Sequence, residues 1–204
     1  MAVTGVVLAA GAGTRMGRPK ALLRTPSGEP WVAVACRLML DAGCDRVVVV
    51  LGASAPEAAL LIPADARVDS VVNPDWEDGM SSSLRAGLAA SSGDGALVTV
   101  VDMPALPGAV AARVLERGLG TPVGDGRAPA AATAEPTRSL VRAVFGGRPG
   151  HPVFIGNAHW APLSATLTGD RGARGYLDAH GVAEVECGDL YDGHDVDVPG
   201  AEAR

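Results

Sequence analysis

The chain has 204 residues, of which 48% are hydrophobic, 20% charged and only 3% aromatic. This composition predicts one globular domain with a core of Val, Leu and Ala, and it excludes a disordered chain. The net charge of −6 argues against a nucleic-acid partner, because counterion release requires patches of Lys and Arg.

The expected elements alternate along the first half of the chain. The pattern predicts buried strands over residues 3–9, 46–51, 68–72 and 96–101. Between and after them it predicts helices over residues 30–41, 56–61 (with Ser54 as cap), 81–90 and 107–117. Such alternation is typical of a Rossmann-like α/β fold, with a mostly parallel central sheet and helices on both faces.

The second half contains one segment of a different kind. Residues 118–137 are rich in Gly, Pro and Ala, and we expect a mobile insert there rather than a domain boundary. Further strands are expected over residues 140–145, 153–155 and 182–187, with 146–150 as a connection and helices over 157–167 and up to 179. Residues 1–204 therefore form a single domain.

The three cysteines, Cys36, Cys44 and Cys187, show no CxxC spacing, so we expect buried free thiols rather than a metal site or a disulfide framework. No basic segment precedes the apolar start of the chain. No later run approaches the roughly 18 apolar residues of a membrane span. We therefore expect a cytoplasmic protein that does not act on a membrane.

A glycine-rich loop follows the first strand. Gly11, Gly13 and Gly17 allow close backbone approach to a ligand, and the side chains of Arg15 and Lys20 can reach phosphate oxygens. The spacing does not fit a Walker loop, and its third glycine comes one residue late for a dinucleotide fingerprint. The loop therefore indicates a triphosphate site at the carboxyl end of the first strand.

Other polar residues also follow predicted parallel strands. The loop beginning at Asn73 and the carboxylate of Asp102 should meet the glycine-rich loop at one edge of the sheet. Asp102 is well placed to bind Mg²⁺, but it could instead cap the next helix. Asp195 and Asp197 are two residues apart, so either could complete a metal site.

The stretch from Leu8 to Leu23 resembles the signature of nucleotidyltransferases that couple a nucleoside triphosphate to a phosphorylated acceptor. Asp102-Met-Pro is similar to that superfamily's metal-binding strand end. With the segments 73–76, 79–88, 147–152, 169–174 and 195–199, the set resembles the MobA-like group, and within it the molybdenum cofactor cytidylyltransferase branch. Two positions near the end depart from the usual pattern, Val198 and Gly200.

The resemblance implies a role for each matching residue. Arg15, Lys20 and Asp102 would be catalytic, and Asp102 with Asp197 would hold Mg²⁺. The nucleotide would be bound by Leu8, Ala9, Ala10, Gly11, Ala12, Gly13, Thr14, Asn73, Gly79, Ser81 and Ser83. The acceptor side would contain Gly150, His151 and Arg174. The substrates implied are a nucleoside triphosphate, CTP, and molybdopterin, with a molybdoenzyme as a further partner.

Two other functions stay open at this stage. A nicotinamide-dependent oxidoreductase could have reused the scaffold, although the acidic residue expected after the second strand is replaced by Leu51-Gly52-Ala53. A non-catalytic molybdenum cofactor chaperone would not need Asp102 for its role.

Overall fold

The structure is a computed structural model that describes residues 1–121 and 135–194, without the side chain of Arg15. Within these residues, a seven-stranded sheet has the order β3-β2-β1-β4-β6-β5-β7. In chain order the strands are β1 (Val3–Ala9), β2 (Arg46–Leu51), β3 (Val68–Val72), β4 (Gly95–Val100), β5 (Leu140–Phe145), β6 (Arg148–Gly156) and β7 (Ala183–Glu186).

The sheet is mostly parallel, as predicted. β1 pairs in parallel with β2 and β4, β2 with β3, and β5 with β7. Only β6 runs antiparallel to both of its neighbours. Gly146 and Gly147 form a tight turn with φ values of 58° and 75°, which a two-residue hairpin requires. The predicted connection over residues 146–150 is therefore too long, because β6 already begins at Arg148.

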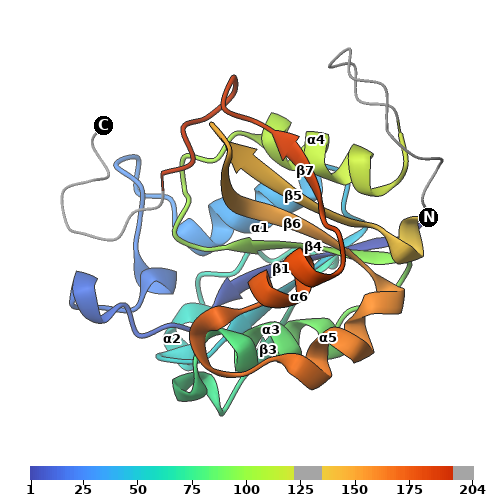
Figure 1. The fold of residues 1–204 in the computed structure, drawn as a ribbon. Coiled ribbons are helices and arrows are strands. Elements are labelled where there is room, and N and C mark those ends of the chain that lie inside the picture. The colour runs from blue at the N-terminus through green and yellow to red at the C-terminus, as the bar shows by residue number, and fades with distance from the viewer. Residues whose placement is uncertain (122–134, 195–204) are drawn as a thin grey trace.

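Helices cover both faces of the sheet (Figure 1). On one face lie α1 (Trp31–Asp41), α2 (Ala55–Ala59) and α4 (Gly108–Gly118). On the other lie α3 (Met80–Ala89), α5 (Trp160–Thr166) and α6 (Arg174–Ala179). This three-layer arrangement confirms the predicted single α/β domain and brings the carboxyl ends of β1 to β4 to one edge.

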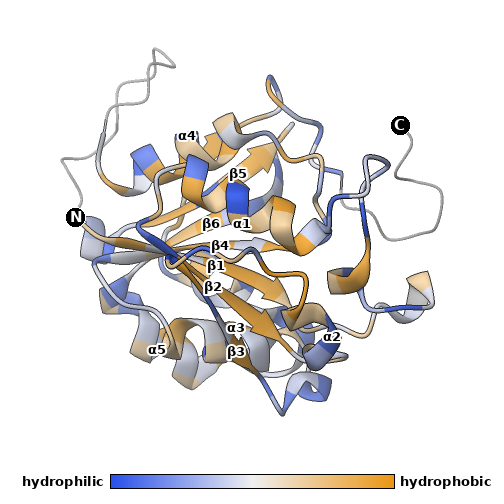
Figure 2. Cartoon of the chain, turned by 180° about the vertical axis from the view of Figure 1, so that it is seen from behind, coloured by the Kyte–Doolittle hydropathy of each residue, from blue (hydrophilic) through white to orange (hydrophobic). Residues whose placement is uncertain are grey.

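Covering both faces explains why the central strands β1, β2 and β4 are largely apolar (Figure 2). All seven residues of β1 are buried. Phe154 is completely buried, and a Cβ on Gly95 or Gly118 would lie 2.4 or 2.3 Å from its ring. With so few aromatic residues in the chain, these glycines make room for a large side chain in a core of small ones.

Several helix starts differ from the prediction, and α5 begins at Trp160 rather than at residue 157. α3 begins at Met80 rather than at a serine, with Gly79 at its N-cap in a positive-φ conformation of 98°. Ser54 lies at the N-cap of α2, but its side chain makes no capping hydrogen bond. In the segment 118–137, Gly118 ends α4 and Pro136–Arg138 form a 3-10 turn. The predicted mobile insert falls mainly on residues 122–134, which lie outside the described residues.

The carboxylate of Glu186 lies in a ring of backbone donors. It accepts hydrogen bonds from the backbone N–H groups of Gly146, Gly147 and Gly188 at 2.9, 3.1 and 2.7 Å. These bonds favour the charged form and lower the pKa of Glu186 from its ordinary value of 4.5. The end of β7 is thereby tied to the β5–β6 turn.

All three cysteines are buried and free, as predicted. Burial raises the pKa of the Cys36 and Cys44 thiols to about 12, and it also raises the pKa of Cys187. None of the helices in the described ranges is long and apolar enough to cross a membrane.

Candidate active site

A cavity of about 490 Å³ opens at the carboxyl ends of the parallel strands. Four separate parts of the chain meet there: the end of β1 with the loop after it, the segment from β3 into α3, the end of β4, and Asp170 from the second half of the chain. This confirms the predicted meeting of strand ends. Its lining residues are Leu8, Ala9, Ala10, Gly11, Ala12, Gly13, Thr14, Lys20, Trp76, Glu77, Gly79, Met80, Ser83, Val100, Val101, Asp102 and Asp170.

The loop after β1 folds back on itself. Gly13 has a φ of 60°, and a Cβ at this position would lie 2.1 Å from the carbonyl oxygen of Arg18. The 3-10 turn η1 (Thr14–Met16) follows, closed by a 2.9 Å hydrogen bond from Met16 N–H to the Gly13 carbonyl. Only glycine fits this position without strain. The turn brings Lys20, the first residue of the 3-10 turn η2 (Lys20–Leu22), back to the cavity.

Lys20 and Asp102 form an ion pair inside the cavity. Lys20 Nζ donates to Asp102 Oδ2 at 2.7 Å, and the two side chains are 16% and 19% exposed. Asp102 Oδ1 is buried and has no hydrogen-bond partner among the described residues. Asp102 does not cap α4, because Pro107 occupies the N-cap there and no side chain caps it. Asp102 instead lines the cavity, and its oxygen without a hydrogen-bond partner is a suitable ligand for a cation.

Asn73 and the serines of α3 are arranged in two layers. Asn73 is buried and does not line the cavity; its amide donates to the hydroxyl oxygens of Ser82 and Ser83 at 2.8 and 3.1 Å. Only Ser83 of these three lines the cavity. Since Ser83 accepts a hydrogen bond from Asn73, its hydroxyl hydrogen can donate to a ligand. Ser81 is also buried away from the cavity, and its Oγ has no hydrogen-bond partner in residues 1–121 and 135–194.

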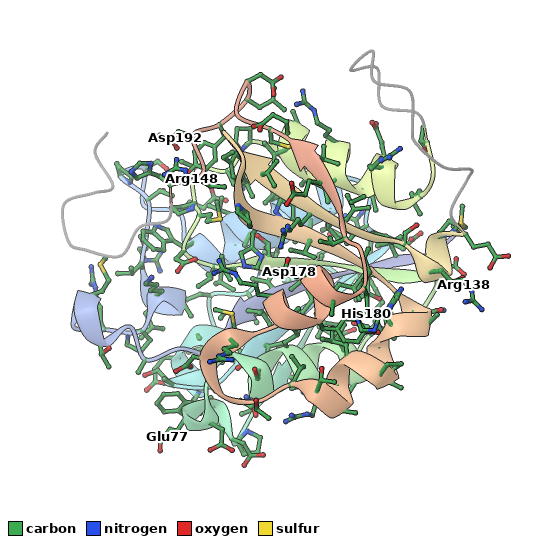
Figure 3. All side chains as sticks on the ribbon, in the orientation of Figure 1. Glu77, Arg138, Arg148, Asp178, His180 and Asp192 are labelled. Carbon is green, nitrogen blue, oxygen red and sulfur yellow. The ribbon has the colours of Figure 1, made fainter. Side chains whose placement is uncertain are left out.

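The residues expected on the acceptor side do not line this cavity. Gly150 packs against the ring of Phe145, which a Cβ would approach to 2.7 Å. His151 lies half-buried in β6, and Arg174 is the exposed first residue of α6. In Figure 3, Arg148 at the start of β6 lies near Asp192, whose carbonyl accepts a 3.3 Å hydrogen bond from it.

Some expected site residues fall outside the description. Asp195 and Asp197 lie in residues 195–204, and the side chain of Arg15 is not described although its backbone belongs to η1. Their expected roles as metal and phosphate ligands therefore stay predictions.

Sequence reasoning did not place Asp170 in the site. The sequence analysis assigned it no role beyond its place in the matching segment 169–174, and the structure brings it to the cavity beside Gly79. Trp76 and Glu77 also line the cavity from the 3-10 turn η3 (Trp76–Asp78), and Glu77 is exposed at its edge (Figure 3). The resemblance of segment 169–174 was the one available signal for Asp170.

Residues 5–185 match the model of the MobA-like NTP transferase domain. The chain belongs to this family. The match covers the glycine-rich loop, the Lys20–Asp102 pair and every other residue that lines the cavity.

Two similar proteins are named for different activities. The chain is 39% identical to nicotine blue oxidoreductase of Paenarthrobacter nicotinovorans, over 96% of this chain and 92% of that protein. It is 34% identical to a probable molybdenum cofactor guanylyltransferase of Rhodopirellula baltica, over 50% of this chain and 49% of that protein.

Among solved structures, Rv0371c of Mycobacterium tuberculosis superposes with a TM-score of 0.74 at 25% identity, covering 97% of this chain and 94% of that one. A second structure of that protein, in complex with manganese, superposes with a TM-score of 0.68 at 23% identity, covering 92% and 89%. This likeness confirms the α/β fold.

Proposed function

We propose that the protein is a nucleotidyltransferase that transfers the nucleotide of CTP to the phosphate of a molybdopterin-type acceptor and releases pyrophosphate. The observation that carries the proposal is the Lys20–Asp102 pair beside the glycine-rich loop in one cavity. The family match and the guanylyltransferase relative support a nucleotidyl transfer, and the choice of CTP and molybdopterin rests on the sequence resemblance.

The cavity supplies the positioning that this reaction needs. The backbone of residues 10–14 would receive the β- and γ-phosphates, with the guanidinium of Arg15 adding charge. Lys20 would lie against the α-phosphate and neutralise the charge that grows there in the transition state. An acceptor phosphate is already a nucleophile, so catalysis consists mainly of positioning and charge neutralisation.

Asp102 is the residue that would hold a divalent cation, and further ligands would be needed, because the described ranges contain no group of three or more His, Cys, Asp or Glu side chains that could bind one. The buried Oδ1 of Asp102 lacks a hydrogen-bond partner in the described ranges, and carboxylate oxygens are the ligands that Mg²⁺ prefers. A bound cation would draw charge from the phosphate oxygens. The sequence resemblance offers Asp197 as the second ligand, and the manganese complex of Rv0371c supports divalent metal use in this fold.

The acceptor would approach past Gly150 and His151 in β6 and past Arg174 at the start of α6. None of these three residues lines the cavity, and their role toward the acceptor rests on the sequence resemblance. The proposal takes the enzyme to be cytoplasmic and the product to pass to a molybdoenzyme.

The test is to incubate the purified protein with Mg²⁺, molybdopterin and each of CTP, GTP, ATP and UTP in turn, and to measure pyrophosphate. We expect release with CTP that depends on both the acceptor and the metal. Absence of pyrophosphate with all four nucleotides would overturn the proposal.

A second function, a nicotinamide-dependent oxidoreductase, is favoured by the 39% identity with nicotine blue oxidoreductase along nearly the whole chain. The glycine-rich loop could hold the pyrophosphate of a dinucleotide. Oxidation of NADH or NADPH with nicotine blue as acceptor, unchanged in an Asp102→Asn variant, would select this function over the transferase.

A further inference from the structure

The cavity is lined by chemically different groups. The glycine-rich loop, Lys20 and Asp102 form the part that suits phosphates. Leu8, Ala9 and Ala10 provide an apolar floor, and all three are buried. The start of α3 and Asp170 also line the cavity, so a nucleotide with its phosphates on the loop could direct its base toward them.

Asp170 reaches the cavity from a distant part of the chain. It lies in the 3-10 turn η6 (Gly169–Arg171), which packs beside the start of α3. A Cβ on Gly79 would lie 2.3 Å from Asp170 Oδ1 and 2.8 Å from the Gly169 carbonyl oxygen. The lack of a side chain at residue 79 is therefore what admits the carboxylate.

The carboxylate is held by one oxygen only. Asp170 Oδ1 lies 3.4 Å from the backbone N–H of Met80, the first residue of α3. For Asp170 Oδ2 the described ranges contain no hydrogen bond and no ion pair. Asp170 is exposed and lines the cavity, so its second oxygen is accessible to a ligand.

A carboxylate can only accept hydrogen bonds, so it distinguishes bases by their amino groups. Cytosine presents an exocyclic amino group where uracil presents a carbonyl oxygen, and carboxylates are known partners of the cytosine amino group. Ser83 also lines the cavity, with its hydroxyl oxygen already accepting from Asn73. Its hydroxyl hydrogen can therefore donate to an acceptor on the base ring.

We propose that Asp170 is a specificity-determining residue that accepts a hydrogen bond from the exocyclic amino group of the base and rejects uracil. This inference rests on the proposed nucleotidyl transfer for the orientation of the nucleotide. Neither the family match nor the names of the relatives assign Asp170 a role.

The experiment measures dissociation constants for CTP and UTP, each with Mg²⁺, by titration calorimetry on the wild type and on Asp170→Asn. Asn has the same shape and can still accept from the Met80 N–H, but it can turn its amide donor toward the uracil carbonyl. We expect the wild type to bind CTP about tenfold more tightly than UTP, and the variant to bind them about equally. The control is Asp41→Asn at the exposed end of α1, which removes the same charge outside the cavity and should keep the wild-type ratio.

Equal binding of CTP and UTP by the wild type, or an unchanged ratio in Asp170→Asn, would overturn the inference. Pyrophosphate release, measured in parallel, separates the two proposals. Pyrophosphate release with an unchanged ratio of CTP to UTP affinity in Asp170→Asn refutes only the role of Asp170. Loss of that ratio without pyrophosphate release refutes only the transferase. Failure of every nucleotide to bind refutes both.

Discussion

The Lys20–Asp102 pair yields the most demanding test of the site. The change is Lys20→Met, which removes the charge and keeps most of the apolar stem. The 2.7 Å separation corresponds to an attraction of about 1.5 kcal/mol in water and about 6 kcal/mol at an effective dielectric constant of about 20. Desolvation offsets most of this attraction for side chains that are 16% and 19% exposed.

We therefore expect Lys20→Met to lower the free energy of unfolding by about 1–2 kcal/mol, because it leaves the Asp102 carboxylate largely buried without its partner. Turnover should fall at least about 100-fold, the usual effect of losing one group that stabilises transition-state charge. Urea unfolding and pyrophosphate release measure the two effects on the same preparations.

The double variant Lys20→Met/Asp102→Asn separates stability from catalysis. Removing both charges should restore the free energy of unfolding to within about 0.5 kcal/mol of the wild type, since no unpaired charge stays buried. Turnover should stay at least about 100-fold down. Turnover within a few-fold of the wild type in either the single or the double variant would refute the assigned roles.

Three further predictions concern the supporting structure. Gly79→Ala should lower the free energy of unfolding by about 1–3 kcal/mol, because φ is 98° there and the new methyl group would clash with Asp170. The control is Gly175→Ala, which has no atom within 4 Å of the added Cβ and should not change the free energy of unfolding. Equal losses for the two variants in urea unfolding would contradict the steric argument. The pKa of Glu186 is lowered in the folded protein, so its hydrogen bonds stabilise the fold fully above pH 4.5, and this stabilisation is lost as the pH falls through the folded pKa. The melting temperature of Glu186→Gln should therefore lie below that of the wild type at pH 7 and approach it in acid. A difference in melting temperature that does not change with pH would refute this. The three buried thiols should not react with Ellman's reagent in the native protein and should all react in denaturant, and rapid native labelling would count against their burial.

Much of the fold followed from the sequence because its central strands are buried on both faces. Continuous apolar runs between polar turns gave β1 and β2 their observed bounds, and β3 was predicted with its observed bounds although Asp69 and Ser70 interrupt its apolar run. The helix starts were less well predicted, because the start of α3 depends on a positive-φ glycine at its N-cap rather than on a serine. The spacing of hydrophobic residues along the chain does not reveal a backbone conformation of this kind.

The site residues, too, were predicted only in part. The glycine-rich loop and Asp102 were visible as polar residues directly after apolar strands, and parallel strands necessarily bring their carboxyl ends to one edge. Asn73 was expected at the ligand, but the structure places it behind Ser83, which it holds by a hydrogen bond. Which of two polar neighbours faces a cavity depends on side-chain packing, and spacing along the chain does not report it.

The sequence by itself determined that a phosphate-binding loop, a cationic side chain and a carboxylate lie at one edge of a parallel sheet, because strand alternation and buried apolar runs are local properties. Only the tertiary structure decided that Lys20 pairs with Asp102 across 82 positions and that Asp170 approaches Met80 across 90. Contacts of that separation arise from how helices pack on the sheet, and here the missing side chain of Gly79 leaves the space that Asp170 occupies.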